Sequence, residues 1–248
     1  MASKKKQPLD ELLVEQGLAP SLNRARALIM AGEVVVDDHA VDKPGTLVAL
    51  TAQIRLKNLP NRYVSRGGTK LEKPLDTFSV NVSGKVVIDV GASTGGFTDC
   101  LLQRGARKVY AIDVGYGQLA WKLREDARVK TLERTNICDL TAQDISAPPD
   151  LAVIDVSFTS LQKIWPPVIA LIKPGGELLS LVKPQFEAAK EDVEAGGIVR
   201  SLKTYQKVMQ AVVGTAHALS VHVAGIMESP IRGQKGNREF FLYAVKKT

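Results

Sequence analysis

Three charged side chains stand where buried strands are predicted to begin or end. The segment LLSLVKPQFE has the pattern of an apolar strand that stops at Lys183, and Pro184 prevents that strand from continuing inside a sheet. The run LAVIDVSF reaches Asp155 at its end, and a last strand begins at about Glu239 in GNREFFLYAV. If this last strand runs antiparallel to the others, its start lies at the edge where the others end. We therefore expect Asp155, Lys183 and Glu239 to converge.

The elements that would carry these residues alternate along the chain beyond Gly84. Strand-like apolar runs are KVVIDV, KVYAID, VKTL, LAVIDV and ELLSLV, and helical segments separate them. This alternation predicts an α/β fold, a Rossmann-like doubly wound sheet that is mostly parallel with an antiparallel last strand. Ligands of such sheets bind at the carboxyl ends of the strands, where the charged side chains are expected.

A glycine-rich loop follows the first of these strands. In VVIDVGASTGGFTD the strand ends at Asp89, and a helix is predicted to start near Gly96. Glycines permit a tight turn and let backbone N–H groups approach a ligand, but the Gly-x-Gly-x-x-Gly spacing of NAD sites is absent. A carboxylate before the loop suits a cation better than a pyrophosphate. S-adenosylmethionine fits these demands, because it carries an ammonium, a sulfonium and a ribose without phosphate.

Two further residues complete the predicted cofactor site. Asp113 ends the second strand, 22 residues after Gly91, a spacing at which an acidic residue binds ribose hydroxyls in nucleotide-binding folds. Asn136 follows the third strand and could contact the adenine. The alternative is that both residues only form turns at strand ends. The predicted site comprises Asp89, Gly91, Ala92, Ser93, Gly95, Gly96, Phe97, Asp113, Val114 and Asn136.

The N-terminal part of the chain reads as a separate small module. Residues 1–60 contain two short helical patterns, PLDELLVEQG and LNRARALIMAG, the second of which Ser21 can cap, followed by short strands in EVVVDDHAVDKPGTLV. This predicts a small α+β domain. We expect a linker over 61–66 and the large domain over 67–248, because Pro60, Gly67 and Gly68 interrupt the pattern.

The composition favours a soluble protein with an anionic partner, which the charge alone does not name. The 248 residues carry a formal charge of +7, and residues 1–74 hold 12 Lys and Arg against 8 Asp and Glu. Basic residues placed to contact phosphates are Arg24, Arg26, Arg62 and Arg66, although each could also be a solvated surface arginine. No apolar run spans a bilayer, no signal peptide is evident and the two cysteines have no metal-site spacing. We expect a cytoplasmic protein without a metal or a membrane partner.

Several spaced motifs resemble one known family. SRGGTKL, DVGASTGGFTD, AIDVGYGQLAW, ERTN, DVSF, VKPQFE and GNREFF together are similar to the haemolysin A-type (TlyA) ribosomal RNA methyltransferases, which belong to the FtsJ-like 2′-O-ribose methyltransferases. The resemblance covers nearly the whole chain, because LNRARALIMAGEVVVDDHAV resembles the alpha-L RNA-binding motif that precedes their catalytic domain. Tyr63 departs from the tryptophan common in the family.

The resemblance implies an activity and a set of catalytic residues. It implies a class I fold and S-adenosylmethionine-dependent 2′-O-methylation of a cytidine in ribosomal RNA, with the RNA or a ribosomal subunit as partner. The family's Lys-Asp-Lys-Glu tetrad falls on Lys70, Asp155, Lys183 and Glu239. Desolvation and the nearby Lys70 would lower the pKa of Lys183 so that it acts as general base. Asp155 would orient it, while Glu239 and Lys70 would position the nucleotide.

Other functions stay open on the sequence alone. A cytosine C5-methyltransferase needs a nucleophilic cysteine near DVSF or VKPQFE, and neither Cys100 nor Cys138 is there. A membrane-active haemolysin needs amphipathic or apolar segments, which are not evident. A non-catalytic RNA-binding protein would not bind the cofactor. We expect a monomer, while a homo-oligomer remains open.

Overall fold

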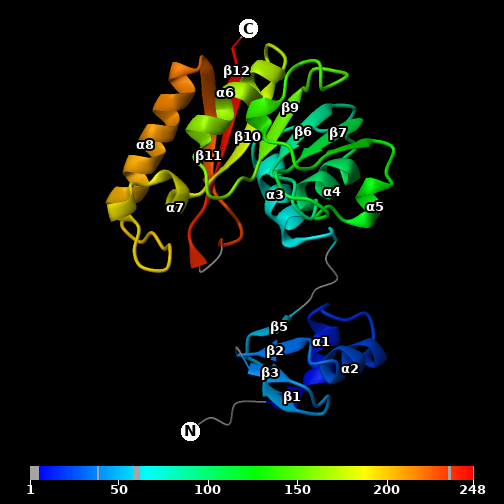
Figure 1. Cartoon of the computed structure of the whole chain (residues 1–248). Coiled ribbons are helices and arrows are strands. Elements are labelled where there is room, and N and C mark those ends of the chain that lie inside the picture. The colour runs from blue at the N-terminus through cyan, green and yellow to red at the C-terminus, as the bar shows by residue number, and fades with distance from the viewer. Residues whose placement is uncertain (1–5, 38, 58–61, 234–235, 248) are drawn as a thin grey trace. The chain divides into compact units, whose positions relative to one another are not determined.

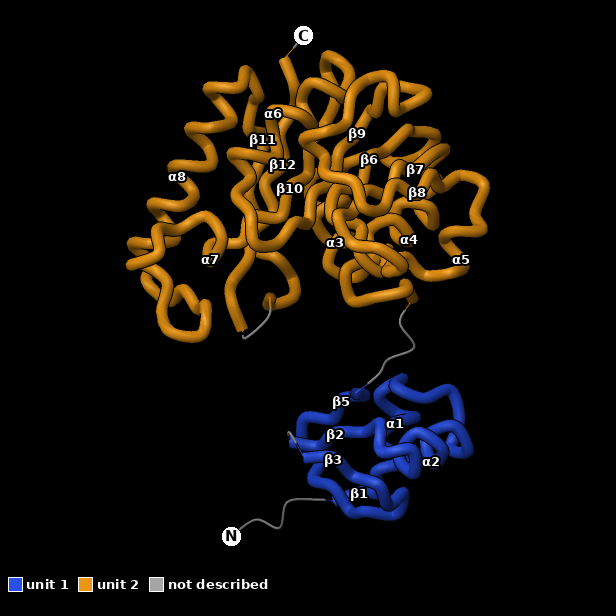
Figure 2. Tube along the Cα trace, viewed as in Figure 1, with its two compact units in different colours: residues 1–61 blue, residues 62–248 orange. Residues whose placement is uncertain are grey.

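The computed structural model describes residues 6–37, 39–57, 62–233 and 236–247. The chain divides into two compact units, residues 1–61 and 62–248 (Figure 2). Each has an apolar core of its own. Unit 1 contains one cluster of buried apolar residues, which lie between Leu9 and Leu56. Unit 2 contains two such clusters, whose residues lie between Tyr63 and Ala244.

Unit 1 is a small α+β domain, as the sequence predicts. Its elements are β1 (Lys6–Pro8), α1 (Leu9–Glu15), α2 (Leu22–Met30), β2 (Val34–Val36), β3 (His39–Val41), β4 (Leu47–Ala49) and β5 (Ile54–Leu56). The strands form an antiparallel sheet in the order β3-β2-β5 and a separate β1-β4 pair. Ser21 caps α2 by accepting a hydrogen bond from the Arg24 N–H, so the local start signal decides where this helix begins.

Unit 2 is built on a seven-stranded sheet in the order β11-β12-β10-β9-β6-β7-β8 (Figure 1). The strands are β6 (Val86–Val90), β7 (Lys108–Ile112), β8 (Val129–Leu132), β9 (Leu151–Ile154), β10 (Glu177–Val182), β11 (Val221–Glu228) and β12 (Phe240–Lys246). Strands β10, β9, β6, β7 and β8 are parallel, and β12 pairs antiparallel with both β10 and β11. The predicted fold class is therefore confirmed.

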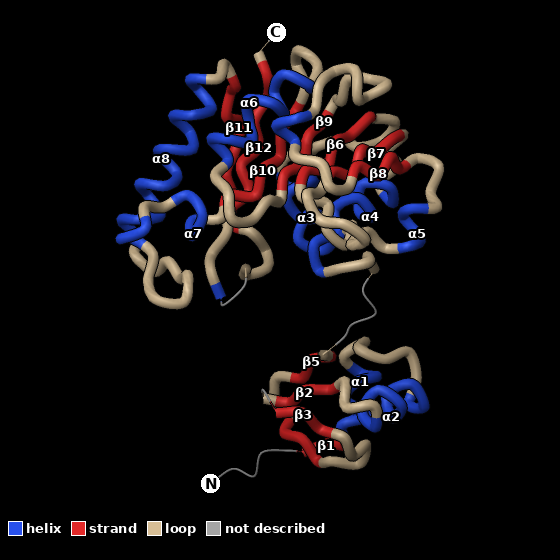
Figure 3. The backbone as a smooth tube through the Cα atoms, viewed as in Figure 1, coloured by secondary structure: helices blue, strands red, loops and turns tan. Residues whose placement is uncertain are grey.

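Helices cover both faces of this sheet (Figure 3). They are α3 (Arg66–Thr77), α4 (Gly96–Gln103), α5 (Trp121–Arg124), α6 (Leu161–Leu171), α7 (Pro184–Glu187) and α8 (Leu202–Ala218), with short 3-10 turns at Ile137–Asp139 and Lys190–Asp192. Alternate residues of β6 enter different clusters: Ile88 joins residues of α6 and α8, and Val87 joins residues of α3, α4 and α5. The continuous apolar runs seen in the sequence arise because central parallel strands are buried on both faces.

Two features of unit 2 differ from the sequence pattern. Strand β11 is not among the predicted strands, because it lies at the sheet edge and only alternate residues are shielded. The segment predicted as a linker packs onto unit 2 from Arg62 onward. Tyr63 is buried and its hydroxyl donates to Glu72 Oε1 at 2.5 Å, while the Val64 N–H donates to Asp99 Oδ2 at 2.8 Å.

Candidate active site

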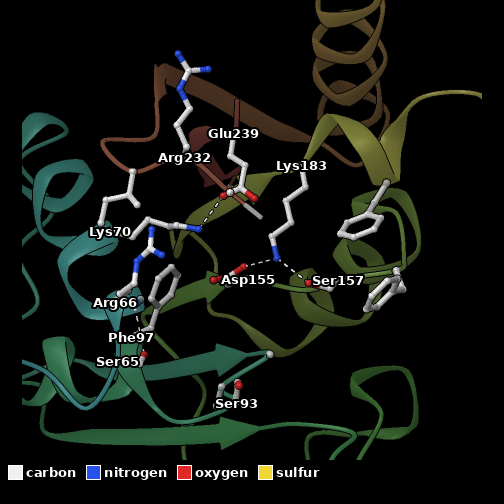
Figure 4. Close-up of a pocket in the computed structure, with 18 of the residues that line it drawn as sticks. Ser65, Arg66, Lys70, Ser93, Phe97, Asp155, Ser157, Lys183, Arg232 and Glu239 are labelled. Atoms are coloured by element: carbon white, nitrogen blue, oxygen red, sulfur yellow. Dashed lines mark hydrogen bonds and ion pairs between the residues drawn. The ribbon is translucent and has the colours of Figure 1, made fainter. Parts of the chain in front are cut away.

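Four charged residues from four elements meet at one edge of the sheet. Asp155 follows β9, Lys183 follows β10, Glu239 immediately precedes β12, and Lys70 comes from α3. The antiparallel register places Phe240 opposite Val182, so the start of β12 adjoins the end of β10. Lys70 Nζ lies 2.7 Å from Glu239 Oε2, and Lys183 Nζ lies 2.6 Å from Asp155 Oδ1 (Figure 4). The structure therefore arranges the four residues as two ion pairs.

Both ion pairs are largely shielded from solvent. Lys183 is 8% exposed and Glu239 is 3% exposed, values that are uncommon for charged side chains. The Lys183 ammonium also donates a hydrogen bond to Ser157 Oγ at 2.9 Å. Such buried charges are tolerated when each is paired, and removal of one partner leaves the other without compensation.

The glycine-rich loop passes close to this cluster. Gly91 has φ +86°, and a Cβ at this position would lie 2.5 Å from the Asp155 carbonyl oxygen. A Cβ on Gly96 would lie 2.2 Å from Ser65 Oγ, because the first turns of α3 and α4 are in contact. Gly95 has φ +96° and occupies the N-cap position of α4. Larger residues would push the loop away from the strand ends, so the glycines are explained by close approach of the backbone.

Asp113 organises the next loop along the edge. One carboxylate oxygen accepts from the Ser93 N–H at 2.8 Å, and the other accepts from the Gly115 N–H at 2.7 Å. Glu133 fixes the same region by accepting hydrogen bonds from the N–H groups of Gly117, Gln118 and Leu119. These hydrogen bonds lower the pKa of Glu133 and connect the residue that follows β8 to the loop after β7.

Two adjoining cavities open at this edge. The first has a volume of about 340 Å³ and contains all four charged residues; the second, of about 620 Å³, lies over the ends of β6 and β7. Both are lined by Gly91, Ser93, Asp155, Ser157 and Phe158. Of the predicted cofactor residues, Ala92, Gly96 and Phe97 line only the first cavity, and Asp113, Val114 and Asn136 line only the second.

Two of the predicted cofactor residues line neither cavity. Gly95 serves the turn into α4, where a Cβ would collide with Leu123. Asp89 is completely buried beneath the loop, and Thr98 donates a hydrogen bond to its Oδ2 at 2.6 Å. Burial, reinforced by the negative charges of Asp155 and Asp113, raises the pKa of Asp89 to about 7. Asp89 thus supports the loop from below.

The predicted RNA-contacting arginines have different environments. Arg24 is exposed on α2, whereas Arg26 forms an ion pair with the buried Asp10 at 2.8 Å. Arg62 pairs with Glu72 at 2.6 Å, and Arg66 is exposed and lines the first cavity. The structure therefore gives Arg26 and Arg62 intramolecular partners that the sequence did not indicate.

Several cavity residues were not singled out from the sequence. Phe158 is 89% exposed with φ +62°, and its ring lies 5.0 Å from that of Phe186. Gln185 and Arg232 line the first cavity together with these rings. Phe158, Gln185 and Phe186 lie within the motifs DVSF and VKPQFE. Their closeness in sequence to Asp155 and Lys183 was the signal that could have identified them as cavity residues.

Comparison with known proteins agrees with this geometry. The FtsJ-like methyltransferase family matches residues 63–246, and the S4 domain matches residues 7–54. The chain belongs to the FtsJ-like methyltransferase family. This confirms the resemblance drawn from the motifs, and the S4 match falls on the α+β module of unit 1. This protein is therefore a methyltransferase.

Relatives match over almost the whole chain. The chain is 49% identical over 240 residues to "Putative rRNA methyltransferase YqxC" of Bacillus subtilis, covering 96% of this chain and 85% of the relative. It is 43% identical over 241 residues to "16S/23S rRNA (cytidine-2'-O)-methyltransferase TlyA" of Mycobacterium tuberculosis, covering 97% and 90%. The solved structure "Putative hemolysin from Streptococcus thermophilus" superposes with a TM-score of 0.77 at 43% identity, covering 99% and 90%.

Two kinds of feature are absent from the described residues. Within the described part of the chain, no helix combines the length and apolar character that crossing a bilayer requires. The same residues contain no group of three or more histidine, cysteine or acidic side chains arranged to hold a metal ion.

Proposed function

We propose that this FtsJ-like methyltransferase transfers a methyl group from S-adenosylmethionine to the ribose 2′-hydroxyl of a cytidine in ribosomal RNA. The observation that carries the proposal is the pair of shielded ion pairs, Lys183 with Asp155 and Lys70 with Glu239, in a cavity that adjoins the nucleotide loop. The name of the 43% identical M. tuberculosis relative supports the ribose, the cytidine and the ribosomal RNA.

The residues of the second cavity suit the adenosyl part of the cofactor. Asp113 holds two backbone N–H groups, and each carboxylate oxygen retains acceptor capacity for a ribose hydroxyl. Val114 and Ile137 provide apolar surface for the adenine, beside the polar Asn136. Gly91 and Gly96 let the loop pack closely against Asp155 and Ser65, and both line the first cavity, into which the methionyl part would extend along the loop.

The ion pairs suit removal of a proton from a hydroxyl. Bound S-adenosylmethionine supplies an electrophilic methyl group, so the protein needs chiefly to align the hydroxyl and accept its proton. Lys183 takes the 2′-hydroxyl proton after its ammonium has released to solvent the proton that it carries in the ion pair with Asp155. Asp155, 2.6 Å away, stabilises the ammonium that results, while Ser157 fixes the side chain. Lys70 and Glu239 position the nucleotide.

Exposed arginines and the S4 match suit a structured RNA. Unit 1 matches the S4 domain and carries the exposed Arg24, while Arg66 and Arg232 lie at the first cavity. Arginines at such positions bind phosphates and hold the RNA without reading its sequence. Phe158 offers a nearly fully exposed ring on which a base can stack. A cytoplasmic location, where ribosomes are made, is part of this proposal.

The deciding experiment is methyl transfer to ribosomal subunits that lack the modification. Purified enzyme is incubated with each subunit and isotopically labelled S-adenosylmethionine, and both ribosomal RNAs are then mapped for alkali-resistant linkages and by mass. We expect one or more 2′-O-methylcytidines with the wild-type enzyme and none with Lys183→Ala. Methylation confined to bases or to transfer RNA would refute the proposal, and RNA binding without cofactor binding would favour a non-catalytic RNA-binding protein.

A further inference from the structure

Two residues that line the first cavity, Asp155 and Gln185, each carry a buried side-chain oxygen without a hydrogen-bond partner. Among the described residues, the buried side-chain atoms in this condition are Asp89 Oδ1, Asp155 Oδ1 and Gln185 Oε1. Asp155 Oδ1 lies against the Lys183 ammonium, and Asp89 lies beneath the loop. Gln185 is therefore the cavity residue whose buried acceptor has no compensating charge. A buried acceptor without a hydrogen bond is unfavourable, so a bound donor is its natural complement.

The position of Gln185 indicates which ligand reaches it. Gln185 lies on α7, between Lys183 and Phe186, and it lines the first cavity but not the second. The second cavity and the part of the first cavity that the glycine loop lines form the cofactor side. On the Gln185 side, the aromatic rings of Phe158 and Phe186 lie 5.0 Å apart. A ribose held at Lys183 would direct its base toward the Gln185 amide and these two aromatic rings.

We propose that the Gln185 amide binds the Watson–Crick edge of the base whose ribose is methylated. The inference rests on the proposed function and adds a substrate-binding residue to it. With cytosine, Oε1 accepts a hydrogen bond from the exocyclic 4-amino group and Nε2 donates to ring N3. Oε1 is shielded in this structure, so the side chain turns toward the cavity to bring the carbonyl to this donor. A carboxylate of the cofactor could accept from Nε2 but has no proton to donate to Oε1, so it would leave this acceptor unsatisfied.

The amide holds the base without selecting between the pyrimidines. Rotation by 180° exchanges its donor and acceptor, so the same side chain matches the N3–H and O4 of uracil. Gln185 therefore contributes to binding and alignment of an extruded base. Choice of the methylated site is left to the surrounding RNA contacts.

The test combines a change in the protein with a change in the substrate. Single-turnover methyl transfer is measured for wild type and Gln185→Leu, on RNA that carries either cytidine or the pyrimidin-2-one riboside, which lacks the 4-amino group, at the methylated position. We expect loss of the amino group to slow the wild type at least about fivefold, and to slow Gln185→Leu less than twofold. Gln210→Leu, on the exposed part of α8, is the matched control and should behave as wild type.

The outcomes separate this inference from the proposed function. Equal sensitivity of wild type and Gln185→Leu to the amino group would overturn the inference while leaving the methyltransferase activity in place. A Gln185→Leu defect confined to the dissociation constant of S-adenosylmethionine would also overturn it, because the amide would then bind the cofactor ammonium. If Gln185→Leu does not fold, Gln185→Glu retains the acceptor and must retain the sensitivity. Absence of transfer by the wild type would instead refute the proposed function.

Discussion

Replacement of Lys183 separates two roles that the structure allows. Its ammonium lies 2.6 Å from Asp155 and 2.9 Å from the Ser157 hydroxyl, so it could accept a proton or simply anchor negative charge. Arginine preserves the positive charge but does not accept a proton at neutral pH. A general base therefore predicts that Lys183→Arg and Lys183→Ala are similarly inactive. A purely electrostatic role predicts that Lys183→Arg keeps much of the activity.

The expected loss can be stated for catalysis and for stability. A positioned proton acceptor contributes about 10²–10⁴ in rate, which corresponds to about 2.7–5.4 kcal/mol of barrier. Lys183→Ala also leaves the Asp155 carboxylate without its cation. Breaking a fully buried pair costs about 3–5 kcal/mol, and because the Asp155 side chain is 23% exposed we expect about 1–3 kcal/mol.

The assay must keep these two effects apart. Single-turnover methyl transfer at saturating RNA and cofactor gives the chemical rate, and urea unfolding of the same samples gives the stability. The double variant Lys183→Met with Asp155→Asn removes both charges and should recover most of the lost stability while staying inactive. Activity of Lys183→Arg within about tenfold of wild type would refute the general-base assignment and leave the methyltransferase assignment intact.

Three further predictions follow from the geometry. Asp113→Ala should weaken S-adenosylmethionine binding by about 10- to 100-fold in calorimetry, because ribose hydrogen bonds to a charged acceptor are lost; unchanged affinity would exclude Asp113 from the site. The pKa of Asp89 is raised from 3.8 to about 7, so the folded state binds a proton more tightly than the unfolded state does. The free energy of unfolding of the wild type should therefore fall by up to about 4 kcal/mol as pH rises from 4 to 8. Asp89→Asn should lack this fall in urea unfolding, and parallel pH profiles of the two proteins would contradict the assignment. Deletion of residues 1–61 should leave unit 2 folded on its own apolar clusters, while RNA affinity drops and its salt dependence becomes shallower, as filter binding at several salt concentrations would show; an unchanged salt slope would count against a role of unit 1 in phosphate binding.

The sequence alone determined the features that depend on local chemistry. Apolar runs and their spacing predicted the alternating strands and helices, and the glycines after Asp89 predicted a tight loop, because backbone freedom and burial pattern act over a few residues. The charges at strand ends predicted a common edge once parallel strands and an antiparallel last strand were assumed. That assumption holds, since β12 runs antiparallel between β10 and β11.

Tertiary structure decided which groups meet and which are shielded. The ion pair of Lys70 with Glu239 joins residues far apart in the chain, and Arg26 forms an ion pair with Asp10. The sequence predicts Asp89 as part of the cofactor site, and the structure shows that it is buried beneath the loop and accepts a hydrogen bond from Thr98. Gln185 shows no pattern of its own, and its unsatisfied oxygen becomes visible only when the walls of the cavity are assembled. Ion-pair partners, solvent exposure and unsatisfied hydrogen bonds depend on long-range packing, which residue order along the chain does not encode locally.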